Sequence, residues 1–439
     1  MDAIVKMPTY EAYKDSGVEW LGEVPSEWPV LKMRYLYRDT SIKNRPNETL
    51  LSVTQDKGVV PRDWVENRMV MPSGNLESFK FIEEGDFAIS LRSFEGGLEY
   101  CHHAGIISPA YTVLKSIKNG LTKGYYKYLF KSQAFISELQ TSIVGIREGK
   151  NISYEELKYS YLPIPSSDQQ TLIANFLDQK TAQIDEAIAI KEQQIALLKE
   201  RKQIIIQKAV TQGLDPDVPM KDSGVDWIGE IPAHWNLKSL KFYIEKIIDN
   251  RGRTPAFGDY GIPMLEVKNI TEGNHQPTEV FSKFVNPKLV KSYERDNVEI
   301  GDILISTVGA TSGKAVIIQK TPNYFICQNV VGIRMVSEVN RLFASYALAS
   351  SYFKTSLMLI NKGNTIDNLK VSVFINNPLL LPPEEEQEAI SLYIDNALKE
   401  NDIGIEHLHL QITKLKEYKT TLINSAVTGK IRITPEMVA

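Results

Sequence analysis

A fifteen-residue segment that occurs twice constrains this chain of 439 residues more than any other feature. Residues 14–28 read KDSGVEWLGEVPSEW, and residues 221–235, which lie 207 positions further on, read KDSGVDWIGEIPAHW. Ten of the fifteen positions are identical, and three more exchange Glu for Asp, Leu for Ile or Val for Ile. Such internal identity predicts a chain that is built as two copies of one unit.

A second repeat consists of two segments with a helical pattern. Residues 169–211 contain neither Gly nor Pro, and they lie between a Ser/Asp start signal and a stop signal rich in Gly and Pro. Residues 387–428 align with them at an offset of 217, so that Gln170 matches Gln387 and Asp185 matches Asp402. The sequence therefore predicts two equivalent long helices.

The apolar residues of both helices recur every seven positions, which is typical of a coiled-coil seam. Polar residues interrupt this seam at Lys191, Asn401, Lys202 and Lys419. Such residues lower stability but fix the register of a coiled coil. The predicted seam consists of Leu177, Ile184, Ile188, Ile195, Leu198, Ile205, Ile394, Ile405, Leu408, Ile412, Leu415 and Leu422.

The matching phases of the two helices favour pairing with each other over separate packing on their own domains. Helices of some 40 residues would be roughly 60 Å long, which is longer than a domain core requires and suits a spacer. Antiparallel pairing would place two globular domains at opposite ends, related by a pseudo-twofold axis.

The segments between the helices, 28–165 and 235–380, combine short β-branched or aromatic runs with helical stretches. EEGDFAISLRS (83–93) corresponds to EIGDILISTVG (299–309), which predicts the same turn and apolar strand in both segments. The expected fold class is α+β, with two globular α/β domains separated by two long antiparallel coiled-coil helices. The expected divisions are a repeat segment (1–27), a first domain (28–165), a first helix (166–212), a linker with the repeated motif (213–234), a second domain (235–380), a second helix (381–430) and a tail (431–439).

Charge is unevenly distributed along the chain, whose formal net charge is −4. Residues 28–165 carry a net charge of +3 and residues 235–380 carry +5, so the remaining segments together carry −12. Two mildly basic bodies in an acidic frame can face a polyanion, although this charge alone does not establish nucleic-acid binding. The two cysteines, the lack of a signal peptide and the lack of a membrane-spanning run favour a reducing cytoplasm.

No catalytic constellation stands out in the sequence. GATSGK (309–314) lacks the spacing of a phosphate-binding loop, and CHH (101–103) has no second cluster to complete a metal site. Asp259, Glu266 and Lys268 form a loose carboxylate–carboxylate–lysine set, for which a core strand with surface charges is the better interpretation. Binding and scaffolding are therefore favoured over catalysis.

Taken together, the duplicated fifteen-residue segment, GIPMLEVKNIT, EEGDFAIS and the paired helix starts resemble the specificity subunit of type I restriction–modification enzymes. The resemblance covers about residues 10–430. It implies a non-catalytic subunit whose two target recognition domains each read one half of a split double-stranded DNA sequence. It also implies two methyltransferase subunits docked on this chain, with restriction and translocase subunits beyond them. S-adenosylmethionine, ATP and magnesium are then expected in the partner subunits, and no cofactor is expected in this chain.

Arg and Lys suit guanine edges and phosphates, whereas Asn and Gln suit adenine. RGRTP (251–255) is the strongest candidate, because two arginines around a glycine can approach a groove closely. The candidate DNA-binding residues are Arg92, Ser93, His102, Arg147, Lys150, Arg251, Arg253, Lys314, Gln328 and Asn329.

Two alternatives remain open at this point. A two-headed coiled-coil scaffold that binds only proteins would share the architecture, but it would leave the basic bias of both domains unexplained. Within the repeated segment, Trp28 and Trp235 are expected to pack in the interior. Trp20 and Trp227 suit either packing or a dock for the methyltransferase.

Overall fold

The computed structural model describes residues 7–65, 76–144, 151–250, 256–270, 276–288, 297–308, 312–326, 329–360 and 369–438. The chain forms two compact units, of which unit 1 comprises residues 1–191 with 410–439 and unit 2 comprises residues 192–409. Each unit holds one globular domain, domain 1 or domain 2, together with parts of both long helices. Among the described residues, no helix is long and apolar enough to cross a membrane.

Domain 1 contains a four-stranded antiparallel sheet in the order β4–β11–β8–β9. The strands of this sheet are β4 (Tyr37–Thr40), β11 (Thr112–Ser116), β8 (Phe87–Ile89) and β9 (Glu99–Tyr100). Shorter antiparallel pairs surround it, namely β5 (Leu51–Thr54) with β6 (Gly58–Pro61), β7 (Lys80–Ile82) with β10 (Gly105–Ile107), β12 (Ile143–Val144) with β13 (Asn151–Ile152), and β3 (Val30–Lys32) with β14 (Tyr161–Pro163). Its helices are α2 (Ser93–Gly96), α3 (Lys123–Leu129), α4 (Gln133–Thr141) and α5 (Tyr154–Leu157).

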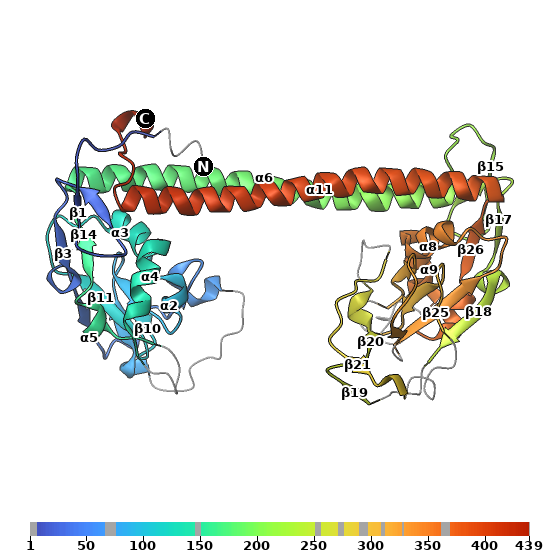
Figure 1. Ribbon diagram of the computed structural model, residues 1–439, viewed down its shortest axis with the longest axis horizontal. Helices are drawn as coiled ribbons and strands as arrows, with labels where there is room; N and C mark the ends of the chain where they lie inside the picture. Colours follow the sequence, from blue (N-terminus) through green and yellow to red (C-terminus); the bar gives the residue numbers. More distant parts are fainter. Residues whose placement is uncertain are drawn as a thin grey trace. The chain divides into compact units, whose positions relative to one another are not determined.

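Domain 2 repeats this sheet with the strand order β18–β25–β22–β23. The strands are β18 (Ile244–Asp249), β25 (Val330–Met335), β22 (Ile303–Ser306) and β23 (Ala315–Ile317). A second sheet contains β19 (Phe257–Gly258), β21 (Phe284–Val285), β20 (Ile262–Leu265) and β24 (Phe325–Ile326), and β17 (Asn236–Ser239) pairs with β26 (Pro378–Leu381). Its helices are α8 (Arg341–Ala349), α9 (Ser351–Ile360) and α10 (Val371–Ile375). In each unit, one helix lies between the main sheet and the long helices: α3 in unit 1 and α8 in unit 2 (Figure 1).

Short 3₁₀ segments complete the described elements. They span Met33–Tyr35, Arg62–Trp64, Leu76–Ser78, Leu240–Tyr243, Val267–Asn269 and Pro435–Met437.

The predicted acidic-Gly-Asp turn precedes an equivalent central strand in each domain. Gly85 and Gly301 have φ angles of 85° and 89°, a conformation that residues with a Cβ rarely adopt. The Asp that follows each glycine accepts a hydrogen bond from a backbone N–H three residues earlier, at 3.0 Å for Asp86 and 2.7 Å for Asp302. The turn and the strand order therefore confirm that the two domains are copies of one fold.

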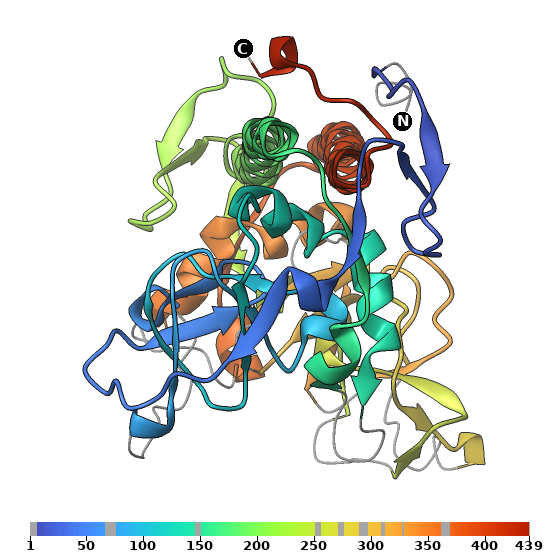
Figure 2. The same ribbon diagram turned by 90° about the vertical axis from the view of Figure 1, so that its left-hand side faces the viewer.

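The two long helices are α6 (Ser167–Gln212) and α11 (Glu384–Val427), which lie side by side when viewed along their length (Figure 2). Their contacts show antiparallel pairing in each unit: Asp185 of α6 contacts Lys419 of α11 in unit 1, and Lys202 contacts Asp402 in unit 2. All twelve predicted seam residues are buried or half-buried. The predicted mutual pairing is therefore confirmed, and separate packing of the helices is excluded.

Two of the polar seam residues, Lys202 and Lys419, form equivalent ion pairs in the two units. Lys202 Nζ lies 2.6 Å from Asp402 Oδ1, and Lys419 Nζ lies 2.7 Å from both carboxylate oxygens of Asp185. Since Lys202 aligns with Lys419 and Asp402 with Asp185, duplication has copied one pair of charges to both ends of the seam. A role of these lysines in fixing the register of the seam stays a prediction.

The fifteen-residue repeat forms a hairpin in each unit: β1 (Tyr13–Asp15) with β2 (Glu23–Pro25), and β15 (Met220–Asp222) with β16 (Glu230–Pro232). The first hairpin lies beside α11 (Figure 2), and Tyr13 Oη donates to the carbonyl of Gly429 just beyond that helix. Trp28 and Trp235, the last residues of the two repeats, are completely buried. Their expected role in packing is thus confirmed.

Each of these tryptophans also anchors a helix start. The indole N–H of Trp28 donates to Gln169 Oε1 at 3.1 Å, and that of Trp235 donates to Glu386 Oε2 at 3.0 Å. A Cβ on Gly213, just after α6, would lie only 3.3 Å from the Trp235 ring. In unit 2, the repeat therefore joins the start of α11 to the end of α6.

A buried glutamine joins each long helix to its own domain. Gln170 donates to the Pro165 carbonyl at 2.8 Å and accepts from the Thr122 amide at 2.7 Å. Gln387 makes the corresponding bonds in unit 2, to the Pro382 carbonyl at 2.9 Å and from the Asn340 amide at 2.7 Å. These bonds fix how each helix leaves its domain.

Candidate nucleic-acid interface

An open groove of about 610 Å³ lies at one end of the main sheet of domain 1. It is formed by the β5–β6 turn, by the segment after β8 and by the residue before β11. Polar groups supplied by Gln55, Lys57, Arg92 and Tyr111 line it. Amide, ammonium and guanidinium groups of this kind contact base edges and phosphates. The lining residues are Val53, Thr54, Gln55, Asp56, Lys57, Val65, Ser90, Leu91, Arg92 and Tyr111.

Arg92 and Ser93, which were predicted together, have different environments. Arg92 is exposed and lines the groove, as a DNA-contacting residue would. Ser93 is completely buried, and its Oγ accepts a hydrogen bond from the Ser90 amide at 2.8 Å. A side chain with no exposed surface cannot reach a DNA base, so Ser93 supports the loop and is not retained as a contact.

Gln55 lies between two parts of the groove wall. Its side-chain Nε2 donates to the Arg92 carbonyl at 3.2 Å, and its backbone carbonyl accepts a hydrogen bond from Lys131 Nζ at 3.1 Å. Lys131 Nζ in turn lies 2.6 Å from Oε2 of Glu99, a residue with no exposed surface. The conformation of the groove wall is thereby connected to a buried ion pair.

His102 is exposed next to the turn that carries Lys57. Its ring packs edge-on against Tyr100 at 4.8 Å, and it lies beside Gly58. Partial burial lowers the pKa of His102, and the positive charges of Lys127 and His103 lower it further. At neutral pH the ring is thus mainly uncharged, which suits a hydrogen-bonding contact better than a phosphate contact.

The corresponding end of the main sheet in domain 2 brings together Lys314 and Asn329. The Lys314 carbonyl accepts from the Ser306 amide at 3.0 Å, and the Asn329 carbonyl accepts from the Thr307 amide at 3.0 Å. Both residues are half-buried beside the end of β22. The strand pairing shows that this end of β22 corresponds to the end of β8 that precedes the groove. Phe87 in β8 and Ile303 in β22 occupy the same position in the pairing of their sheets. The two domains therefore place candidate contacts at the same end of the same sheet.

The remaining candidates lie outside the described residues. They are Arg147, Lys150, Arg251, Arg253 and Gln328.

Sequence reasoning missed Gln55, Lys57 and Tyr111 as parts of the groove. The signal for the first two was present in SVTQDKGVVP (52–61), where two β-branched runs flank a short polar turn that contains a glycine. No local signal marks Tyr111. It lies near the groove only because β11 pairs with β8, which brings the start of β11 to the end of β8.

The acidic residue considered for metal-dependent chemistry is neutralised by lysines. Glu266 lies 3.0 Å from Lys268 Nζ and 2.6 Å from Lys283 Nζ, and these charges and hydrogen bonds lower its pKa although burial opposes them. Burial raises the pKa of the Cys101 thiol to about 12, so it is protonated at neutral pH. Within the described parts of the chain, no group of three or more His, Cys, Asp or Glu residues could hold a metal ion.

Comparisons with known proteins agree with this architecture. The family described as Type I restriction modification DNA specificity domain matches residues 238–419. The type I restriction enzyme MjaVIII specificity subunit of Methanocaldococcus jannaschii is 25% identical over 357 residues, which cover 80% of each chain. The putative MjaX specificity subunit of the same organism is also 25% identical, over 94% of this chain and 96% of its own.

The chain is thus similar to type I restriction enzyme specificity subunits over most of its length. The fold agrees, since a chain from a solved structure of the type I R-M system superposes with a TM-score of 0.65. That chain is 15% identical, and the match covers 92% of this chain and 98% of the other.

Proposed function

We propose that this chain is the DNA specificity subunit of a type I restriction–modification complex, in which each domain reads one half of a bipartite target. The main support is that two copies of one fold place polar and basic candidate contacts at the same end of an equivalent sheet. Two such readers on one chain suit two patches of a duplex, with unread base pairs between them. The length of the paired helices would then set that gap.

In domain 1 we assign base or phosphate contacts to Gln55, Lys57 and Arg92, with His102 beside them. In domain 2 we assign them to Lys314 and Asn329. Arg and Lys pair best with guanine edges, and Asn and Gln with adenine. The candidates outside the described residues, which are Arg147, Lys150, Arg251, Arg253 and Gln328, stay predictions for the same surfaces.

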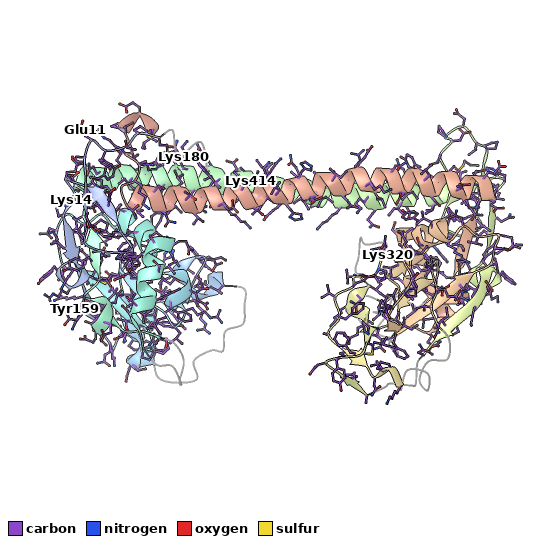
Figure 3. All side chains as sticks on the ribbon, viewed as in Figure 1. Glu11, Lys14, Tyr159, Lys180, Lys320 and Lys414 are labelled. Atoms are coloured by element: carbon purple, nitrogen blue, oxygen red, sulfur yellow. The ribbon has the colours of Figure 1, made fainter. Side chains whose placement is uncertain are left out.

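The paired helices are proposed as the dock for two methyltransferase subunits, with restriction and translocase subunits joining through them. Apolar side chains remain exposed on both helices, including Leu197 (64%) on α6 and Leu410 (53%) on α11. Polar side chains such as Lys180 and Lys414 project from the same helices (Figure 3). Apolar residues within a polar rim are typical of partner interfaces.

We infer that catalysis and its cofactors belong to the partners. S-adenosylmethionine, ATP and magnesium would bind to the methyltransferase and restriction subunits, and this chain would itself be non-catalytic. The complex would act in the cytoplasm, where the host DNA lies. A scaffold that binds only proteins is the alternative, and it gives no role to the groove of domain 1.

The test is to express the chain with its methyltransferase partner and to sequence host DNA for methyladenine. We expect methylation at one bipartite motif, which disappears when this chain is deleted. Exchanging residues 28–165 for those of a relative should change one half of the motif and leave the other half unchanged. Methylation that does not depend on this chain, in the presence of a competent methyltransferase, would favour the scaffold.

A further inference from the structure

Domain 1 contains a buried carboxylate paired with a half-buried lysine, at positions where domain 2 has apolar residues. In the sheet, Glu99 pairs with Ala88 and Val316 pairs with Leu304, and Ala88 and Leu304 are equivalent residues of the repeated strand. Glu99 therefore corresponds to Val316.

The lysine of the pair can be aligned in the same way. Ser132 precedes α4 and donates to the Leu129 carbonyl at 2.7 Å, whereas Ser350 precedes α9 and donates to the Ala347 carbonyl at 2.5 Å. The residue before each serine is Lys131 in domain 1 and Ala349 in domain 2. The Glu99–Lys131 pair thus corresponds to Val316 and Ala349.

The buried carboxylate is costly for the fold. Glu99 has no exposed surface and, beyond its 2.6 Å contact with Lys131 Nζ, neither carboxylate oxygen has a hydrogen-bond partner among the described residues. Replacing a buried ion pair with apolar residues of similar volume is often neutral or stabilising. Because domain 2 forms the same sheet with Val and Ala, the fold does not require the charges.

The charges instead connect to the groove. Lys131 Nζ reaches from Glu99 to the carbonyl of Gln55, and Gln55 Nε2 continues to the carbonyl of Arg92. The Gln55 side chain also packs closely on Gly96, where a Cβ would lie 2.8 Å from Nε2. One chain of contacts therefore runs from the buried carboxylate to two lining residues of the groove.

We propose that Glu99 and Lys131 are positioning residues, which hold Gln55 and the segment of Arg92 in the arrangement that discriminates the domain 1 half of the DNA target. This inference rests on the proposed function and adds a specificity device that is confined to one domain. Neither residue needs to touch DNA, since Lys131 acts through the backbone of Gln55.

The pair also predicts a dependence on pH near neutrality. Burial raises the pKa of Glu99 to about 7, the Lys131 charge opposes this rise, and Asp56 is the other charged group that acts on it. Below this pH Glu99 becomes neutral, so Lys131 loses its anionic partner and holds Gln55 less firmly. Discrimination by domain 1 should therefore fall as the pH drops from 8 to 6.

The experiment uses the full chain in complex with its methyltransferase subunits, after the bipartite motif and the half read by domain 1 are known. Affinity is measured at fixed salt, from pH 6 to 8, for the cognate duplex and for duplexes with one base pair changed in either half. Salt is held constant because it strongly alters all DNA affinities. The variants are E99V/K131A, which copies domain 2, and E99Q, which preserves shape.

At pH 8, both variants should lose about tenfold in discrimination at the domain 1 half, the order expected for one misplaced base contact. Discrimination at the domain 2 half should remain within about twofold of the wild-type value. Unchanged discrimination in a folded E99V/K131A complex would overturn the proposal. Should E99V/K131A fail to assemble, E99Q decides: its discrimination should be low and independent of pH, and a profile parallel to wild type would overturn the proposal.

Glu83→Gln is the matched control, because it removes an exposed carboxylate that pairs with Lys115 in the same domain. We expect wild-type discrimination from it, and an equal loss would show that any disturbed carboxylate weakens domain 1. The proposed function fails in a different way, because the wild-type complex would then show no bipartite motif at all.

Discussion

Domains 1 and 2 share a fold but stabilise the same turn with different charges. In domain 2, Arg334 donates two hydrogen bonds of 2.9 Å to the two carboxylate oxygens of Asp302, which has no exposed surface. The equivalent residue in domain 1 is Lys115, which pairs with the exposed Glu83. Asp86, the counterpart of Asp302, accepts a hydrogen bond from the Glu83 amide, and burial raises its pKa. Arg334 also lies 3.2 Å from Glu299, the counterpart of Glu83, so both domains have this ion pair and only domain 2 adds bonds to the buried aspartate.

The first tryptophan of the repeat also has a different environment in each unit. Trp20 of unit 1 is half-buried and packs edge-on against Phe135 at 5.5 Å, whereas Trp227 of unit 2 is 37% exposed. Packing therefore applies to Trp20, and a dock for a partner stays a prediction for Trp227. Duplicated sequence preserves the elements, while their surfaces are free to diverge.

The largest effect on stability is expected from the second tryptophan of the repeat, which is buried in both units. Trp28→Ala and Trp235→Ala should each lower the free energy of unfolding by about 3–5 kcal/mol, because a fully buried indole leaves a large cavity. Chemical unfolding of the full chain measures this. Trp227→Ala is the control and should cost clearly less, because 37% of its surface is already exposed. Similar losses in all three variants would show that the repeats contribute by something other than burial.

The next largest effect on stability should distinguish the acidic-Gly-Asp turn of domain 2 from that of domain 1. Arg334→Ala should lower the free energy of unfolding by about 3 kcal/mol, since it strands the buried carboxylate of Asp302. Lys115→Ala should cost less than about 1 kcal/mol, because both members of its pair are partly exposed. Equal costs in chemical unfolding would contradict the contrast between the domains.

Glu99→Gln should make the protein more stable at alkaline pH. The folded pKa of about 7 lies above the ordinary value of 4.5, so folded Glu99 retains a proton that the unfolded chain releases. Stability is therefore lost as the pH rises from 4.5 to 7, by about 3 kcal/mol in total. Glu99→Gln should match wild type near pH 4 and exceed it by up to that amount at pH 8. The free energy of unfolding of both proteins, measured across this pH range, checks the prediction. A difference between them that does not change with pH would show that Glu99 does not titrate near pH 7.

The smallest effect concerns the helix seam. The side chain of Lys202 is 8% exposed, whereas that of its counterpart Lys419 is 29% exposed. Lys202→Met should leave stability unchanged or raise it by about 1 kcal/mol, because it replaces a buried charge with apolar surface. Lys419→Met should change it by less than about 0.5 kcal/mol. Thermal unfolding compares the two, and a marked loss with Lys202→Met would make that ion pair a source of stability as well as of register.

The sequence by itself determined the duplication, both long helices, their pairing and the resemblance to specificity subunits of type I restriction enzymes. Local signals were sufficient for these features. They are the seven-residue period of apolar residues, the residues that start and stop the helices, and a glycine in a turn that needs a left-handed backbone. Aligned seam lysines and aspartates also lie in one register, so even this long-range contact was encoded in the repeat.

Only the tertiary structure decided which side chains meet at the candidate interface. Ser93 follows Arg92 in the chain, yet one is buried and the other exposed, because α2 begins between them. Glu99, Lys131 and Gln55 lie far apart in the sequence, and no local pattern connects them. They come together because β9, the end of α3 and the β5–β6 turn pack around one end of the sheet. Such contacts depend on packing between distant segments, which the order of residues specifies only through the complete fold.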